Sequence, residues 1–476
     1  MKSFLPFKST YLICFLFFLL YSLLSITRHN NYNSFGFDLG LADQVVWQYS
    51  HFSLPITSIH FYPFTSLLTD HIELIYAPLG VFYWIWNDVR MLLLLQAAIF
   101  SFSGVPIYLL AKRKKLKTPI ATAILLSYLS FYGVQNALWF DVHSAVFGAA
   151  FLSWFIYFLD KKKLLWATIF FILTIICKEN LAMLTFSTSL VYWWITKQRA
   201  FLYYAFASLT YLFFIFGIYF PHLTERGYGY QNTNGILSDL NLFYLFDTAE
   251  KRYAEFVSVA WFGFLPLLSP FFLLPAVGDF FSYFVIANQL KEAQGIFMHY
   301  RITIAPMMTF ATIMTIAKYK RLNNIYVAGY LFLCILFFQY TLHLPISYIA
   351  KKWFWEKPAA VYTINKVLTA LPEQASVVSQ NNIVPHISHR REIFTLWPEK
   401  KSFTTHSPCG KKTCAWFRWG GTPKYLIVDT ANEWDSRHLL APREEYIAGL
   451  QNLEKTGIIK RYKQEGTTIL YKVQNP

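Results

Sequence analysis

Long apolar runs are the feature that most limits what this chain can fold into. An α-helix rises about 1.5 Å per residue, so about 20 apolar residues cross a hydrocarbon core. The candidate runs are residues 11–26, 89–111, 119–138, 142–158, 164–177, 181–195, 201–220, 257–274, 276–287, 302–317 and 325–344. They predict an α-helical polytopic membrane protein with about 10 to 11 transmembrane helices.

The composition favours the same class. Hydrophobic residues make up 55% of the chain and charged residues 14%, whereas soluble domains carry about 25% charged residues. The first run follows Lys2 and Lys8 as a secretory signal would, but no small-residue cleavage site follows it. We therefore expect this run to be retained as the first transmembrane helix.

Basic clusters between the apolar runs predict the orientation, because short cytoplasmic loops retain Lys and Arg. Alternating the helices from an inside N-terminus places all four clusters in the cytoplasm, provided that residues 257–287 form a tight helical pair turning near Pro275. We expect a multi-pass protein of the plasma or inner membrane, with outer loops at residues 27–88 and 221–256. The clusters are residues 112–117, 161–163, 197–199 and 318–321.

The C-terminal part of the chain has a different pattern. Residues 359–371 have helical periodicity, residues 376–379 and 425–429 resemble buried strands, and residues 444–454 again resemble a helix. Residues 458–462 and 468–473 predict a hairpin. We expect a transmembrane domain at residues 1–348 and a small extracytoplasmic α/β domain at residues 349–476.

The formal net charge of +16 raises the possibility of nucleic-acid binding. Much of the excess lies in the topology-setting clusters, so we expect no nucleic-acid partner and, on the outer face, contact with anionic lipid. Cys409 and Cys414 lie in the outer domain, where a short-loop disulfide is favoured. A metal site completed by His406 would lack a fourth ligand.

Ionisable residues at the ends of apolar helices are costly, which makes each of them a candidate for function. Five clusters map to outer helix ends in the predicted topology, and one shared outer cavity would explain this. Each also has a simpler interpretation as a local hydrogen-bonding group, a charge pair or a lipid anchor. The clusters are Asp38 with Asp43 and Gln44; Asp70 with His71 and Glu73; Asp141 with His143; Lys178 with Glu179; and His299 with Tyr300 and Arg301.

These segments resemble a widespread prokaryotic family of predicted membrane proteins that is distantly similar to the GT-C glycosyltransferases. The resemblance runs from about residue 30 to residue 429. It rests on the sequence FDLGLADQVVW at residues 37–47 and on the motifs Asp70-His71, FDVH at 140–143, Lys178-Glu179 and HYR at 299–301. It implies a GT-C-like fold and transfer of a sugar from a polyprenyl-phosphate donor.

The implied chemistry assigns roles to these residues. Asp38 would be the catalytic base for an acceptor hydroxyl, with Asp141 and Glu179 as further catalytic carboxylates. Gly36 and Gly40 flank Asp38, and we expect their freedom to adopt positive φ to bring this carboxylate close to a substrate. Nine other residues of the five clusters would bind substrate: Asp43, Gln44, Asp70, His71, His143, Lys178, His299, Tyr300 and Arg301.

The phosphate leaving group needs positive charge. Lys178 and Arg301 could supply it, or a divalent ion such as Mg²⁺ or Mn²⁺ held by Asp38, Asp141 and Glu179. An Asp-x-Asp pair is absent, which leaves metal dependence open. Arg301 offers bidentate donors to phosphate that Lys cannot reproduce.

Two other classes of function remain open. A lipid or glycolipid transporter predicts ionisable residues along mid-helix positions, but mid-helix polarity here comes mostly from Ser, Thr and Tyr. A membrane scaffold or sensor would use the outer domain to bind a partner. The sequence favours the transferase and does not predict the oligomeric state.

Overall fold

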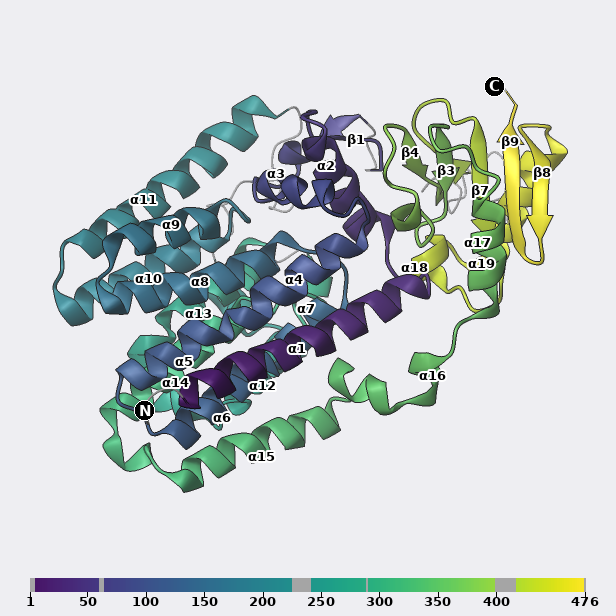
Figure 1. The fold of residues 1–476 in the computed structure, drawn as a ribbon. Coiled ribbons are helices and arrows are strands. Elements are labelled where there is room, and N and C mark those ends of the chain that lie inside the picture. The colour runs from purple at the N-terminus through teal and green to yellow at the C-terminus, as the bar shows by residue number, and fades with distance from the viewer. Residues whose placement is uncertain (1–4, 60–63, 225–240, 288–289, 399–416, 475–476) are drawn as a thin grey trace. The chain divides into compact units, whose positions relative to one another are not determined.

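The computed structural model describes residues 5–59, 64–224, 241–287, 290–398 and 417–474. The chain divides into two compact units (Figure 1). The helical unit contains Met1–Ser25, Leu68–Ile75 and Leu93–Lys351. The sheet unit contains Ile26–Leu67, Tyr76–Leu92 and Lys352–Pro476.

Most of the predicted apolar runs form helices. Within the described residues, Lys8–Asn30, Arg90–Arg113 and Ala200–Leu223 are long and apolar enough to cross a membrane. The predicted α-helical class is therefore confirmed, whereas the predicted number of about 10 to 11 transmembrane helices stays a prediction. The helices are α1 (Leu5–Asn30), α4 (Arg90–Phe102), α5 (Gly104–Arg113), α6 (Thr118–Leu129), α7 (Tyr132–Trp139), α8 (Ser144–Lys161), α9 (Leu164–Ile175), α10 (Leu181–Thr196), α11 (Ala200–Phe214), α12 (Ala249–Ala260), α13 (Leu274–Phe281), α14 (Ile304–Lys318) and α15 (Ile325–Thr341).

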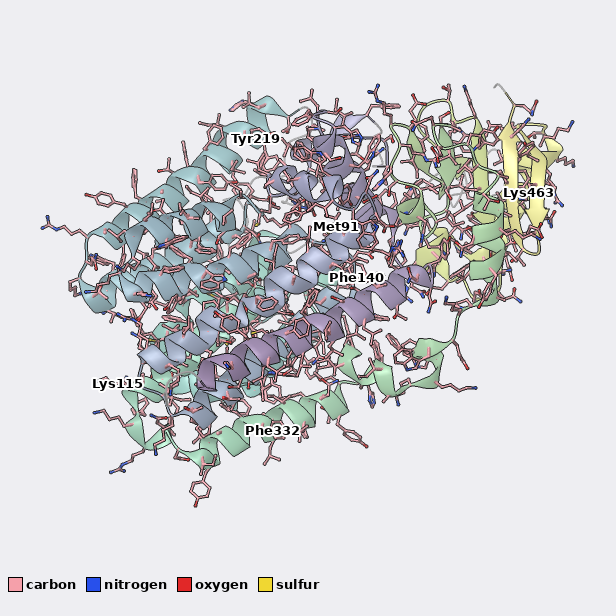
Figure 2. The ribbon with its side chains drawn as sticks, in the orientation of Figure 1. Met91, Lys115, Phe140, Tyr219, Phe332 and Lys463 are labelled. Atoms are coloured by element: carbon pink, nitrogen blue, oxygen red, sulfur yellow. The ribbon has the colours of Figure 1, made fainter. Side chains whose placement is uncertain are left out.

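Two helices illustrate how apolar residues are used in the helical unit. In α14, all residues from Ile304 to Ile316 are buried, so this helix lies inside the unit. In α15, only Ala328, Leu331, Ile335 and Phe338 are buried, and Phe332 is among the apolar side chains that remain exposed (Figure 2). A long helix with an exposed apolar face suits contact with lipid better than contact with water.

The predicted helices at 119–138 and 257–274 are interrupted. The run at 119–138 breaks between α6 and α7, where Ser130 Oγ donates to the carbonyl oxygen of Leu126 at 2.6 Å. The run at 257–274 is not one helix, because Gly263 and Phe264 adopt positive φ and short 3-10 turns follow at Leu265–Leu268 and Pro270–Leu273. The predicted turn near Pro275 is also wrong, since Pro275 lies in the first turn of α13.

The basic loops lie at one end of the helical unit (Figure 1). The backbone N–H of Lys117 donates to Asn323 Oδ1 at 2.8 Å, which joins the loop after α5 to the loop after α14. Arg113 Nε donates to Asp160 Oδ2 at 2.7 Å, which joins the same loop to the end of α8. These loops therefore share one side, as predicted, and their cytoplasmic location stays a prediction.

The sheet unit contains a five-stranded mixed sheet with the order β4-β3-β7-β9-β8. β3 is parallel to β4 and β7, whereas β9 is antiparallel to β7 and β8. This sheet, with α17 packed against β8 and β9, confirms the expected α/β fold and the predicted hairpin. The elements are β3 (Val377–Ser379), β4 (Ile393–Thr395), β7 (Tyr425–Asp429), β8 (Ile459–Glu465), β9 (Thr468–Val473), α17 (Ala359–Leu368), α18 (Ser436–Leu439) and α19 (Arg443–Lys455).

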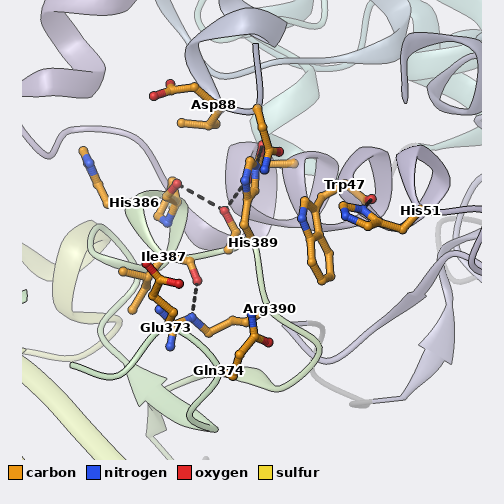
Figure 3. A pocket seen from close by; sticks show the side chains of 14 residues that line it. Trp47, His51, Asp88, Glu373, Gln374, His386, Ile387, His389 and Arg390 are labelled. Atoms are coloured by element: carbon orange, nitrogen blue, oxygen red, sulfur yellow. Dashed lines mark hydrogen bonds and ion pairs between the residues drawn. The ribbon is translucent and has the colours of Figure 1, made fainter. Parts of the chain in front are cut away.

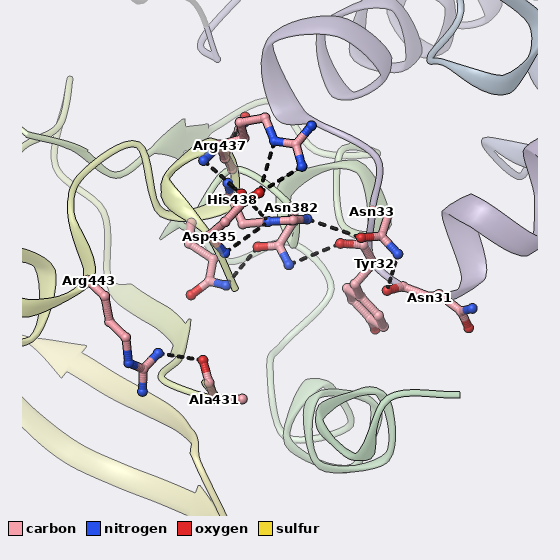
Figure 4. A network of polar contacts seen from close by, with 11 residues as sticks. Asn31, Tyr32, Asn33, Asn382, Ala431, Asp435, Arg437, His438 and Arg443 are labelled. Atoms are coloured by element: carbon pink, nitrogen blue, oxygen red, sulfur yellow. Dashed lines mark hydrogen bonds and ion pairs between the residues drawn. The ribbon is translucent and has the colours of Figure 1, made fainter. Parts of the chain in front are cut away.

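Much of the predicted first outer loop is folded into the sheet unit. This part includes a π-helical turn at Gly36–Gly40, α2 (Leu41–Ser50), α3 (Tyr76–Leu79) and the short pair β1 (Ile56–Thr57) and β2 (Thr65–Ser66). Hydrogen bonds connect it to the C-terminal residues (Figure 4). Asn382 Nδ2 donates to the carbonyl oxygen of Tyr32 at 3.1 Å, and His438 Nε2 lies 3.1 Å from Asn33 Oδ1.

Candidate functional site

Three helices of the helical unit begin beside predicted site residues. His143 precedes α8, Lys178 and Glu179 precede α10, and Arg301 precedes α14. Each of these helices ends at a basic loop, so the site residues lie at the opposite end of the unit. We call residues 70–73, 141–144, 178–180 and 299–301 together the polar cluster.

A pair formed by His71 and Glu179 lies within the polar cluster. His71 Nδ1 is 2.8 Å from Glu179 Oε1, and the backbone N–H of Ile72 donates to Glu179 Oε2 at 3.1 Å. Ile72 packs against Ile215 and Phe220, which holds this short segment in place. Burial alone would raise the pKa of Glu179, but the charges of His71 and Lys178 and the hydrogen bond from His71 lower it to about 2.

The pKa of a second carboxylate, Glu73, is shifted in the opposite direction to that of Glu179. Glu73 is 6% exposed and accepts a hydrogen bond from Ser144 Oγ at 2.6 Å. Burial raises the pKa of Glu73 and outweighs the charges of His71 and Lys178, which lower it; the charge of Glu179 adds to the rise. Two neighbouring carboxyl groups whose pKa values are pushed apart can hold and release a proton separately. Glu179 is therefore suited to remain ionised, and Glu73 is suited to carry a proton.

Lys178 supplies positive charge to the cluster. Burial alone would lower its pKa, but the charges of Glu73 and Glu179 raise it above the ordinary lysine value, so the side chain stays an ammonium. The side chain is half-buried. In the part of the chain that the structure describes, its ammonium group makes no hydrogen bond or ion pair.

Histidine rings join the starts of α8 and α14. The rings of His143 and His299 stack with their centroids 3.4 Å apart. The ring centroid of Tyr300 lies 4.1 Å from that of His299. The backbone N–H of His143 donates to Gln96 Oε1 at 2.9 Å. Burial and the nearby positive charges hold the pKa of His299 well below its usual range, so this ring remains neutral.

Arg301 is a fully buried member of the polar cluster. Its Nη2 donates to the carbonyl oxygen of Ala293 at 2.7 Å, and its Nη1 lies 3.9 Å from Asp279 Oδ2. Among the described residues, Nε and Nη1 of Arg301 have no hydrogen-bond acceptor. Aromatic rings enclose the guanidinium group, whose carbon lies 4.7 Å from the ring centre of Tyr283 and 4.9 Å from that of Phe284.

The structure thus gathers the four predicted segments of the helical unit. Asp70 is half-buried beside His71, and Asp141 is fully buried in the turn before His143. Sequence reasoning missed Asp279, which also accepts from Thr303 Oγ1 at 2.5 Å. The signal was available, because Asp279 is the only charged residue in the apolar stretch 257–287.

Asp38, Asp43 and Gln44 belong to the sheet unit. Asp38 is half-buried in the π-helical turn. We expected Gly36 and Gly40, which flank Asp38, to adopt positive φ. This expectation is wrong, because neither glycine does so. Instead, Val384 packs against both: a Cβ at either position would lie 2.9 Å from Val384 Cγ1. These glycines permit close packing of two segments.

The sheet unit also contains a pocket of about 480 Å³ (Figure 3). Of the predicted site residues, Asp43 alone is among the described residues that line this pocket. Asp43 accepts hydrogen bonds from the hydroxyl groups of Tyr83 and Ser388, and its Oδ1 lies 3.0 Å from His389 Nε2. The pocket is lined by Asp43, Trp47, His51, Asn87, Asp88, Val89, Glu373, Gln374 and residues 385–390.

Gln44 has a structural position. Its Nε2 donates to the carbonyl oxygen of Arg390 at 3.0 Å, and its Oε1 accepts from Thr57 Oγ1 at 2.8 Å.

Cys409 and Cys414 lie outside the described residues, so the predicted disulfide stays a prediction. Within the described ranges, no group of three His, Cys, Asp or Glu side chains could hold a metal ion.

Apolar helices, a cluster of buried charges at their ends and a separate mixed sheet define an α-helical membrane protein with an additional α/β unit. The chain belongs to the family described as Predicted membrane protein (DUF2079), whose model matches residues 28–408. The match contains the polar cluster and the pocket residues of the sheet unit. None of the curated proteins matches the chain.

Proposed function

We propose that the chain is a membrane transferase resembling the GT-C glycosyltransferases. It moves a sugar from an isoprenoid-phosphate carrier to an acceptor hydroxyl at the outer face of the cell membrane. The observation that carries the proposal is the ammonium of Lys178 in the polar cluster, which has no partner among the described residues and lies beside the starts of α8, α10 and α14.

The polar cluster has the properties of an anion site. The first N–H groups of a helix lack partners within that helix, and the helix dipole adds partial positive charge there. The N-cap residues of α8, α10 and α14, which are His143, Asn180 and Thr303, make no side-chain cap hydrogen bond in the described part of the chain. Lys178 adds a full positive charge and Arg301 a second one. A phosphate at this place would supply the acceptors that these donors lack.

The carboxyl groups and His71 are suited to proton transfer. Ionised Glu179 fixes the Nδ1 proton of His71, which leaves the lone pair of the neutral ring on Nε2. A neutral His71 can therefore accept a proton, and Glu73 can hold one. Asp38, which resides in the sheet unit, is the other candidate base.

The transfer balances without a further reactant. The acceptor oxygen forms a bond to the anomeric carbon, and the bond from that carbon to the phosphate oxygen breaks. The acceptor proton passes to the base, and the isoprenoid phosphate leaves with the bonding electron pair. Lys178 stabilises the negative charge on this leaving group.

The test uses the full chain in lipid nanodiscs with a panel of isoprenoid-phosphate sugars and mixed acceptors. Mass spectrometry follows release of the isoprenoid phosphate. Lys178→Gln is expected to lower the rate by about 10² to 10³. Lys197→Gln is the matched control, because Lys197 lies at the other end of α10 and is exposed; it is expected to keep the wild-type rate.

A second measurement separates transferase from transporter. Movement of a fluorescent isoprenoid phosphate between leaflets is followed in vesicles containing the same proteins. If lipid movement depends on Lys178 and no donor gives sugar transfer, the protein is a lipid transporter and not a transferase. Equal transfer rates in Lys178→Gln and wild type would contradict the proposed anion site at Lys178.

A further inference from the structure

We infer that the pocket of the sheet unit binds a carbohydrate. The pocket lies wholly within this unit, and its volume of about 480 Å³ falls in the range of about 300–1,000 Å³ typical of ligand sites. The inference does not depend on the proposed transfer reaction, because a transferase, a transporter or a scaffold could each carry such a site.

Trp47 provides the apolar surface that a sugar ring needs. Its indole lies in the pocket between His51 and His389, with the rings of Trp47 and His389 nearly parallel at 19° and 6.1 Å between centroids (Figure 3). The C–H face of a pyranose packs against such a ring, while the indole N–H remains a donor. In the described part of the chain, this N–H has no partner.

The polar lining suits hydroxyl groups, which both donate and accept. Glu373, Gln374 and Asn87 are exposed at the pocket and offer carboxylate and amide groups. Asp43 fixes the His389 ring through Nε2. Nδ1 of His389 has no partner among the described residues and is the ring atom left for a ligand hydroxyl.

The charges in the pocket argue against an anionic ligand. Arg390 directs its guanidinium to backbone carbonyls, with Nε 2.8 Å from the oxygen of Ile387 and Nη1 3.0 Å from that of Ala375. These bonds hold the loop and leave Arg390 poorly placed to bind phosphate.

A strongly cationic ligand is also disfavoured. Asp88 is paired with Arg90 through contacts of 2.7 and 2.6 Å, and Asp43 is paired with His389. Glu373 remains as the exposed carboxylate of the lining. A neutral polyhydroxylated ligand therefore fits this lining best.

The experiment uses the full chain in nanodiscs and saturation-transfer NMR with free hexoses and N-acetylhexosamines, with choline as a cationic probe. Wild type is expected to bind at least one sugar. Trp47→Ala is expected to weaken that binding about tenfold or more, because the stacking surface is lost. Trp355→Ala is the control, since Trp355 is an exposed aromatic residue of the same unit outside the pocket.

Glu373→Gln provides a second variant that leaves the fold unaffected, since this side chain is exposed. It is expected to weaken sugar binding about threefold to tenfold, because a charged acceptor is replaced by a neutral one. The inference is overturned if no sugar binds to the wild type, if Trp47→Ala binds equally well, or if choline binds in place of sugars.

Discussion

His71 Nδ1 lies 2.8 Å from Oε1 of Glu179, although the two residues are 108 positions apart in the sequence. The contact joins the short segment Leu68–Ile75 to the start of α10. Burial and the charge of Lys178 lower the pKa of His71, but the charge and hydrogen bond of Glu179 outweigh them, so this pKa is raised. The pair sets both the orientation and the proton affinity of the ring.

Glu179→Gln removes that charge and keeps the size of the side chain. We expect the pKa of His71 to fall and the rate of transfer to drop by about 10-fold to 10²-fold, as is usual when an orienting partner is lost. The measurement is the pH dependence of the rate, whose acidic limb should move to lower pH. Glu250→Gln, at an exposed position, should leave the profile unchanged. An unshifted limb in Glu179→Gln would show that His71 does not control the reaction.

Gly133 allows α7 to approach the backbone of Arg301. A Cβ at this position would lie 2.5 Å from the Arg301 carbonyl oxygen and 2.7 Å from its carbon. Gly133→Ala should therefore lower the free energy of unfolding by about 1–3 kcal/mol, measured by thermal unfolding in detergent. At Gly329 in α15, a Cβ would meet nothing within 4 Å. Gly329→Ala should be neutral or slightly stabilising, and equal effects of both substitutions would contradict the packing argument.

Gly40 and Val384 test the close packing beside Asp38. Gly40→Ala places a Cβ 2.9 Å from Val384 Cγ1, so we expect a loss of about 1–3 kcal/mol in stability. Val384→Ala removes the obstructing atom, and the double variant should be more stable than the sum of the single effects predicts. Strict additivity would mean that the two residues do not touch.

The pair Asp43–His389 predicts a pH-dependent contribution to stability. Burial lowers the pKa of His389, but the charge and hydrogen bond of Asp43 raise it above the ordinary value of 6.5. A raised histidine pKa stabilises the folded state below the unfolded pKa, and this contribution is lost as the pH rises through the folded pKa. The difference in melting temperature between wild type and His389→Gln should therefore shrink as the pH rises above 6.5. A difference independent of pH would show that the ion pair contributes nothing.

Asp38→Asn tests the predicted base. If Asp38 accepts the acceptor proton, sugar transfer should fall by about 10² to 10⁴ while the amount of folded protein in the membrane stays the same. His71→Gln is compared in the same assay, because His71 is the alternative base. Loss of transfer in His71→Gln alone would assign the base to the polar cluster, and wild-type rates in both variants would contradict the transferase mechanism.

Local patterns in the sequence determined the membrane class and many of the elements. Apolar runs predicted most of the helices. Helical periodicity predicted α17 and α19, buried-strand patterns predicted β3 and β7, and two further segments predicted the β8–β9 hairpin. The basic clusters predicted which loops share one end of the helical unit. These properties follow from residues close together in the chain, through side-chain periodicity and the length of a helix.

The tertiary structure alone decided which side chains pair and where the helices break. Glu179 meets His71, Asp43 meets His389 across 346 positions, and Asp279 faces Arg301. Gly36 and Gly40 are required by Val384, which is remote in sequence, and positive φ at Gly263 and Phe264 interrupts an otherwise apolar run. Such contacts depend on how separate segments pack together, and packing between segments leaves no periodic signal within either of them.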